Sequence, residues 1–244
     1  MKKIVLVLIS VIIFSGLLWG TDIYTWENLS DMTLDENHVL KNNLDSGDTG
    51  YNTYASSTAN SNAGWVPIGG GGTVGIFTGS FDGGGFTISA LNINRPDTDN
   101  VGLFGHVGQG ATIENVKLSN VNIKGARGTG SLIGRVTGNE NTLTFRCSSS
   151  GGTVVGDAAV GGLIGSHNSY DTGNANRNLH PTLQESWADV DVSWSRKDAA
   201  ALKFGGLVGC NQKGKIYDSY ALGDVTVDND PQVGGQLYRK ESAV

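Results

Sequence analysis

Four histidines and several aspartates are the residues of this chain whose types could support catalysis or metal binding. None of the histidines stands in the His-Glu-x-x-His spacing that places two zinc ligands and a base on one helix. His167 and His180 share a polar segment with Asp171, but polar loops often collect such residues without function. Ser166 beside His167 has no acid or oxyanion hole to complete a triad. The sequence therefore predicts no metal site and no cofactor.

Paired carboxylates would suit a glycosidase, which holds two carboxyl groups about 5 to 9.5 Å apart. Asp189 and Asp191 alternate with Val190 and Val192, so both aspartates are expected on the solvent face of one strand. Polar residues are ordinary at such positions. A catalytic pair is therefore the less favoured interpretation.

Two other aspartate patterns have structural interpretations. Asp82 and Gly83 stand in a Phe-Asp-Gly-Gly-Gly run and are predicted to form a tight turn. The aspartates at 97–99 and 228–230 leave structural calcium open, although no complete ligand loop follows them.

Aromatic side chains offer a route to binding. Trp187 and Tyr220 follow the same pattern of neighbours in two repeats, which predicts an aromatic pair across adjacent repeats. Placement in the core or at its edge is the favoured alternative to a binding role. Trp194 follows a strand expected to end near Val192, so it is predicted to be exposed and is the candidate for glycan contact.

The elements that must position these residues repeat along the chain. The phrase Gly-Leu-aliphatic-Gly occurs three times, with a worn copy, Ser-Leu-Ile-Gly, at 131–134. Its leucines are 29, 31 and 44 residues apart, and the longest interval contains a polar insertion at about 166–181. A recurrent period of this size marks stacked repeats that bury their apolar faces against one another. The motif residues are Gly102, Leu103, Gly105, Leu132, Gly134, Gly162, Leu163, Gly165, Gly206, Leu207 and Gly209.

Alternating apolar and polar residues follow Leu103, Leu163 and Leu207, which is the pattern of half-buried strands. The chain has 37 glycines in 244 residues, and those of the motif are expected to supply positive φ and close backbone approach at corners. These features predict an all-β fold, a right-handed parallel β-helix of roughly six coils with Gly-rich turns. A β-sandwich or propeller is the alternative.

The phrase Gly-Gly-Leu-Val-Gly at 205–209, with its companions, resembles the GLUG-motif repeats of secreted bacterial and archaeal surface proteins. The stretches 65–69 and 77–91 resemble the segment that precedes those repeats, and the likeness covers roughly 22–237. Ser131 and Gln236 depart from the motif. The resemblance implies an adhesin-like module. Such repeats also occur beside immunoglobulin A peptidase domains, but the sequence offers no residues for that activity.

Lys2 and Lys3 precede an apolar run at 4–19, which predicts a secretory signal over 1–20, with an uncleaved anchor as the alternative. Membrane contact is expected through this segment alone, so the protein is predicted to be secreted or at the cell surface. Residues 21–68 are interpreted as an N-terminal coil and cap region, with 42–62 as a long surface loop. Residues 69–237 are interpreted as the repeats, and 238–244 as an irregular tail left by truncation.

The net charge of −6 argues against nucleic acid as a partner. Cys147 and Cys210 lie in different repeat phases, so two unpaired, semi-buried thiols are favoured over a disulfide. The predicted function is a non-enzymatic surface module whose partner is an extracellular glycan, a host surface protein or another copy of itself. A carbohydrate-active β-helix enzyme and a purely structural stalk remain as alternatives.

Overall fold

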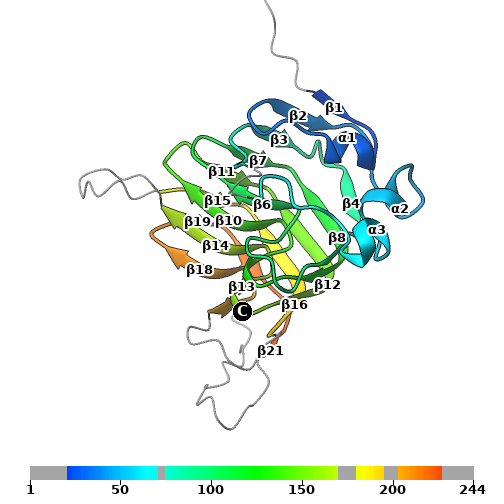
Figure 1. The fold of residues 1–244 in the computed structure, drawn as a ribbon. Coiled ribbons are helices and arrows are strands. Elements are labelled where there is room, and N and C mark those ends of the chain that lie inside the picture. Colours follow the sequence, from blue (N-terminus) through cyan, green and yellow to red (C-terminus); the bar gives the residue numbers. More distant parts are fainter. Residues whose placement is uncertain (1–20, 71–74, 170–179, 195–202, 227–244) are drawn as a thin grey trace, which may run out of the picture.

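The computed structural model describes residues 21–70, 75–169, 180–194 and 203–226, and within these ranges the chain is predominantly β. The all-β class predicted from the sequence is confirmed. The described strands form four sheets, here named A to D, and every pairing between these strands is parallel. Figure 1 shows the strands stacked in order, from β1 and β2 at one end to β18 and β21 at the other.

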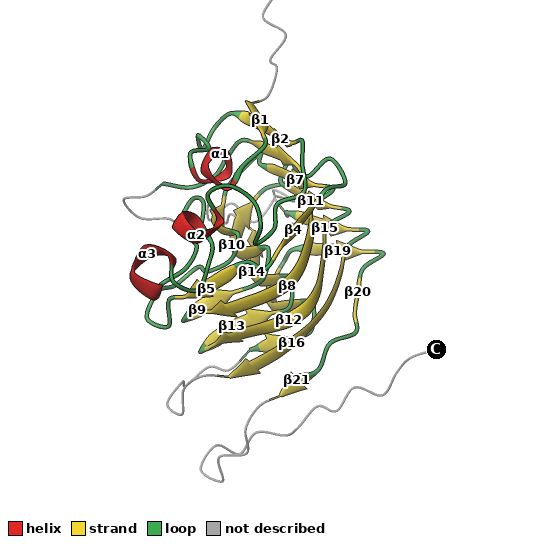
Figure 2. Ribbon diagram, turned by 90° about the vertical axis from the view of Figure 1, so that its right-hand side faces the viewer, coloured by secondary structure: helices red, strands yellow, loops and turns green. Residues whose placement is uncertain are grey.

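Sheet A runs in the order β1 (Thr21–Ile23), β2 (Asn37–Leu40), β3 (Ser80–Asp82), β7 (Thr112–Glu114), β11 (Leu143–Phe145), β15 (Thr182–Gln184) and β19 (Lys215–Tyr217). Sheet B contains the long strands seen in Figure 2 and runs in the order β20 (Tyr220–Ala221), β16 (Trp187–Trp194), β12 (Ser148–Gly156), β8 (Lys117–Lys124) and β4 (Thr87–Ser89), with β5 (Asn92–Asn94) on β8 and β21 (Val225–Thr226) on β16.

The two remaining sheets are shorter. Sheet C runs in the order β18 (Val208–Gln212), β14 (Ile164–Ser169), β10 (Ile133–Gly138) and β6 (Phe104–Val107). Sheet D runs in the order β17 (Phe204–Gly205), β13 (Ala158–Gly161) and β9 (Arg127–Thr129). From β6 onward the chain visits sheets C, A, B and D in the same order each time, and each return adds a parallel neighbour to the strand before.

The register confirms the repeat alignment made from the leucine phrases. The backbone N–H of Leu132 donates to the carbonyl of Leu163 at 3.0 Å, and Leu163 does the same to Leu207 at 3.0 Å. The 44-residue interval is therefore one repeat with added residues in two places, between β14 and β15 and between β16 and β17. The single insertion expected at about 166–181 is wrong in part, because 166–169 belong to β14 and pair in register with β10. Residues 170–179 and 195–202 lie outside the described part of the chain. Leu103, Leu132 and Leu163 are fully buried and form part of one continuous core along the stack.

The motif glycines are required for close packing of backbones. Positive φ at these positions, as expected from the sequence, is wrong: none of the motif glycines has a φ in the left-handed region. A Cβ on Gly165 would lie 2.4 Å from the Thr129 nitrogen, and one on Gly209 would lie 2.4 Å from the Val160 nitrogen. The last glycine of the phrase therefore lets sheet C pass directly against sheet D. At the worn copy, the buried Ser131 hydroxyl donates to the Gly162 carbonyl at 2.5 Å.

The N-terminal region contains three short helical segments at one side of the stack, α1 (Trp26–Ser30), α2 (Tyr51–Tyr54) and α3 (Ala59–Asn62). The long surface loop expected over 42–62 is therefore wrong in part. Leu44 and Ala55 are fully buried, and Leu44 pairs with Ile88 of sheet B. Helices of four or five residues are too short to show a 3.6-residue period, which is why the sequence pattern missed them.

Residues 1–20, which carry the predicted signal, and 227–244, which carry Gln236 and the predicted tail, lie outside the described residues. Within the described ranges, no helix is long and apolar enough to cross a bilayer.

Candidate functional site

An exposed aromatic pair lies on the outer face of sheet B. Trp187 of β16 is in register with Tyr220 of β20, and their ring centroids are 6.2 Å apart with planes only 5° from parallel. The pair predicted from the repeat alignment is confirmed. Of the favoured alternatives, the core or its edge, the core is wrong, because Tyr220 is 53% exposed and Trp187 is partly exposed. We call Trp187 and Tyr220 the aromatic pair.

Strand alternation explains why these rings face outward. Ala188 beside Trp187 is fully buried, so its neighbour on the strand must point away from the core. The same row of sheet B continues through Ser148, Lys117 and Thr87 in the preceding coils. The row thus changes from small polar and basic side chains to large aromatic ones at the last two described strands.

Trp194 differs from its prediction. Strand β16 does not end near Val192 but continues through Trp194, which pairs with Gly156. Trp194 occupies the same side of the strand as the buried Val190 and Val192 and is only partly exposed. Its indole nitrogen is buried and has no hydrogen-bond partner in the described part of the chain. The reason is that the strand alternation extends two residues further than the valine pattern showed.

The aspartates of β16 behave as expected. Asp189 and Asp191 are exposed and alternate with the buried Ala188, Val190 and Val192. Asp191 accepts a hydrogen bond from the backbone N–H of Asp224 in the next coil at 3.3 Å. Both carboxylates therefore lie on an open strand surface.

Asp82 and Gly83 form the predicted turn. The Asp82 carboxylate accepts from the backbone N–H of Gly84 at 2.8 Å and from the Asn115 side-chain amide at 2.9 Å. The positive φ values fall on Gly84 and Gly85, while Gly83 packs so closely that a Cβ would lie 2.4 Å from the Asn115 carbonyl oxygen.

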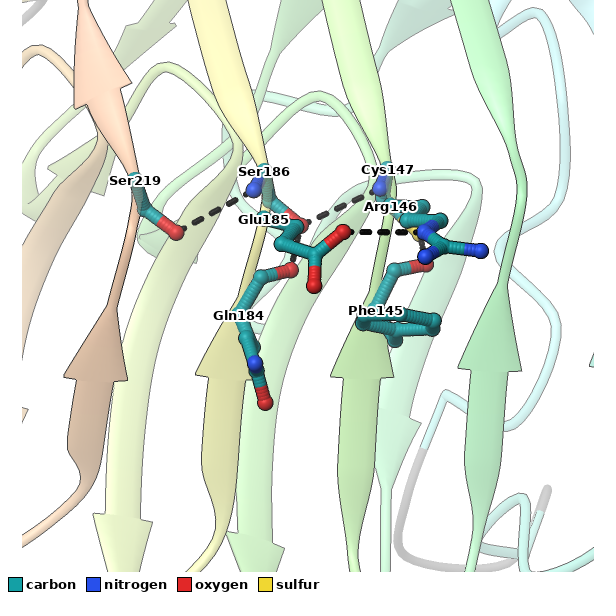
Figure 3. A network of polar contacts seen from close by, with 7 residues as sticks. All are labelled: Phe145, Arg146, Cys147, Gln184, Glu185, Ser186 and Ser219. Atoms are coloured by element: carbon teal, nitrogen blue, oxygen red, sulfur yellow. Dashed lines mark hydrogen bonds and ion pairs between the residues drawn. The ribbon is translucent and has the colours of Figure 1, made fainter.

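A polar network at the corner between sheets A and B was not foreseen (Figure 3). Ser186 accepts from the backbone N–H of Cys147 at 3.1 Å and donates to the Gln184 carbonyl at 2.8 Å, and Ser219 repeats both bonds one coil further on. Arg146 and Glu185, which precede this row, form an ion pair at 2.9 Å on the surface. The Ser-aromatic-Ala phrase was the sequence signal that could have revealed the serine row.

Cys147 occupies the same row as the two serines, and its thiol donates to the Phe145 carbonyl at 3.3 Å. Burial raises the pKa of this thiol to about 12. Cys147 and Cys210 are both free and buried, as favoured from their different repeat phases.

His167 lies in the core row of Val107 and Val136 rather than on a ligand-binding surface. Its Nδ1 lies 3.3 Å from the Asn211 side-chain oxygen, and burial lowers the pKa of the ring to about 4. His180 is described, but Asp171 lies outside the described residues. Across the described ranges, no three His, Cys, Asp or Glu side chains gather in a group that could hold a metal ion.

Comparison with known proteins finds one family motif, at the C-terminal end of the described chain. The GLUG motif matches residues 203–226, which contain β17 to β21. Halomucin from Haloquadratum walsbyi is 42% identical over 117 residues, which cover 48% of this chain and 1% of that protein. A protein named as a Gly-rich membrane protein from Evansella cellulosilytica is 37% identical over 76 residues, which cover 31% of this chain and 8% of that protein.

No solved structure matches the chain. This chain spans only a small fraction of the length of both relatives. The resemblance predicted from the glycine-leucine phrases is confirmed at the last described repeat: the chain carries the GLUG motif.

Proposed function

We propose that the chain is an exported, non-enzymatic repeat module of the cell surface, built as a right-handed parallel β-helix of roughly six coils, that binds an extracellular glycan. The constant order of the four sheets supports the β-helix. Parallel crossovers are right-handed in about 98% of cases, which supports the handedness. The predicted signal at 1–20 and the names of the two relatives, a halomucin and a membrane protein, support a surface or secreted location.

The observation that carries the binding proposal is the aromatic pair. Tyr220 and Trp187 present large ring surfaces to solvent in parallel planes on adjacent strands. Aromatic rings are costly to leave exposed and are enriched where proteins bind partners. Their backbone positions are fixed by the sheet, so little ordering entropy is lost when a ligand stacks on them.

The test is a glycan array on the full chain and on two tyrosine variants. Tyr220→Ala removes one ring of the aromatic pair. Tyr217→Ala is the matched control, because Tyr217 is 49% exposed against 53% for Tyr220 but lies in sheet A. We expect saturable binding that falls at least about fivefold in Tyr220→Ala and stays unchanged in Tyr217→Ala, since an exposed ring contact is worth about 1 kcal/mol. A folded protein that binds nothing on the array would contradict the proposal and favour a structural stalk.

A further inference from the structure

A polar groove lies at a different place from the aromatic pair, between α3 and the strands β5 and β8. Its volume is about 230 Å³, and its described lining includes Ser57, Asn62, Asn92, Asn94, Asn122 and Lys124. Figure 2 shows α3 beside β5 at this side of the stack. Backbone bonds from Trp65 to the Asn92 carbonyl at 2.8 Å and from Asn94 to the Ala63 carbonyl at 2.9 Å hold the α3 segment against the strand.

The rim of this groove is held in a strained conformation. Asn60, Ser61 and Asn62 have φ values of 49°, 59° and 68°, so three consecutive non-glycine residues are left-handed. This conformation is sterically unfavourable for Ser61, whereas asparagine adopts it more readily. The Asn60 side-chain amide donates to the Gly64 carbonyl at 2.8 Å and fixes the turn. Strain that is maintained by specific bonds is characteristic of binding sites, because it preorganises the groups that meet a ligand.

The floor of the groove is a chain of amides in fixed positions. The Asn122 amide donates to the Asn92 side-chain oxygen at 3.2 Å. The Asn92 amide in turn donates to the Ala90 carbonyl at 3.0 Å and to the Tyr51 hydroxyl at 3.3 Å. These bonds orient the two asparagines before any ligand arrives.

Other lining groups remain available. The Asn62 amide, the Ser57 hydroxyl and the Lys124 ammonium have no partner among the residues that the structure describes. The asparagine amide both donates and accepts, as sugar hydroxyls require, while the ammonium donates to anionic oxygens. Lys124 is the sole ionisable residue in the described lining, so the groove carries one positive charge and no carboxylate.

We propose that this groove binds a sugar unit that carries a carboxylate, with Lys124 holding the carboxylate and Asn62 holding ring hydroxyls. The volume is smaller than the roughly 300–1,000 Å³ typical of sites for drug-sized ligands, so one sugar unit of a longer chain fits better than a whole oligosaccharide. The site and its ligand chemistry are independent of the aromatic pair.

The experiment is calorimetric titration of the full chain with a hyaluronan tetrasaccharide, which carries glucuronate, and with tetra-N-acetylchitotetraose, which is neutral. Free glucuronate and acetate are titrated separately to distinguish a polymer unit from a free acid or a bare carboxylate. Lys124→Gln and Asn62→Ala test the groove. Lys117→Gln is the matched control, because Lys117 is an exposed lysine at the other end of the same strand, β8.

We expect hyaluronan to bind up to about fivefold more tightly than tetra-N-acetylchitotetraose, and Lys124→Gln to remove that preference, because Lys124 is exposed and solvent weakens its ion pair with the carboxylate. Asn62→Ala should weaken the binding of hyaluronan, and Lys117→Gln should leave its affinity unchanged. Equal binding of both sugars, equal loss in Lys117→Gln, acetate binding as tight as glucuronate, or no binding by a folded chain would overturn the proposal.

A Trp187→Ala/Tyr220→Ala double variant separates this proposal from the proposed function. If the double variant retains hyaluronan binding that Lys124→Gln abolishes, the groove is the binding site and does not need the aromatic pair. If the double variant loses hyaluronan binding and Lys124→Gln retains it, the groove is refuted and the aromatic pair stands.

Discussion

The substitution Gly165→Ala tests the close approach of sheets C and D directly. A Cβ at this position would lie 2.4 Å from the Thr129 nitrogen, 2.5 Å from the Gly128 carbon and 2.6 Å from the Gly134 oxygen. All three are backbone atoms of hydrogen-bonded strands, so no side-chain rotation can relieve the contact. Separations below 3.0 Å essentially never occur for a real Cβ. The backbone of at least one coil must therefore shift.

Overpacking of this kind costs typically 1–3 kcal/mol and occasionally more, and we expect about 3 kcal/mol because the atoms that clash belong to the backbone. With a urea dependence of about 2 kcal/mol per molar, the midpoint of unfolding should fall by about 1.5 M. The assay is equilibrium unfolding in urea, followed by tryptophan fluorescence.

The matched control is Gly47→Ala. The nearest atom to its added Cβ is a side-chain oxygen of Asp45 at 3.1 Å, which can move aside. Its midpoint should stay close to that of the parent chain, within the roughly 0.5 kcal/mol of ordinary surface changes. Equal midpoints for Gly165→Ala and Gly47→Ala would refute the argument that the motif glycine is required by backbone contact.

Three further predictions concern buried polar groups. Ser131→Ala removes the 2.5 Å bond from the serine hydroxyl to the buried Gly162 carbonyl, which keeps a 3.3 Å bond from the backbone N–H of residue 131. The substitution should cost about 1 kcal/mol in the same urea assay, and an unchanged midpoint would show that the hydroxyl bond contributes nothing. Burial holds the pKa of His167 at about 4 against 6.5 in the unfolded chain, so the unfolded state takes up the proton first. The stability that this residue contributes is complete above pH 6.5 and falls by about 3 kcal/mol as the pH drops toward 4. His167→Val should flatten that part of the profile of unfolding free energy against pH. The remaining slope is due in part to His106, whose pKa is also about 4. Cys147, with its pKa raised to about 12, should resist Ellman's reagent until the chain unfolds, and rapid labelling of the native thiol would contradict its buried placement. Cys147→Ser should change the free energy of unfolding by less than about 1 kcal/mol, because a serine hydroxyl already occupies the equivalent position at Ser186 and Ser219.

The repeat register was available from the sequence because it depends on local spacing. Leu103, Leu132, Leu163 and Leu207 align in the structure as the phrases predicted, even across the 44-residue interval. The stacking of Trp187 on Tyr220 followed from the same alignment, since equivalent positions in adjacent coils must lie side by side. Exposure of the pair also followed from the strand alternation, because Trp187 has the parity of Asp189 and Asp191, which were expected on the solvent face. The interpretation as core residues went against that alternation and relied on the usual burial of large aromatic rings.

The polar groove could not be predicted from the sequence. Asn62 and Lys124 are far apart along the chain, and nothing in their local spacing indicates that they meet. Their presence in one groove depends on the left-handed turn at 60–62, whose residues carry no glycine signal, and on the docking of this turn against β5. Likewise, the aligned serines became a hydrogen-bond row only because each lies one strand spacing from the next.

The sequence by itself determined the β class and the repeat register, because periodic apolar anchors and alternating strands are properties of neighbouring residues. The tertiary structure decided where the glycines are needed, that Trp194 turns inward, and which polar side chains converge on the groove. The physical reason is that these features depend on distances between repeats, which parallel backbone hydrogen bonds fix only once the strands of successive repeats have paired.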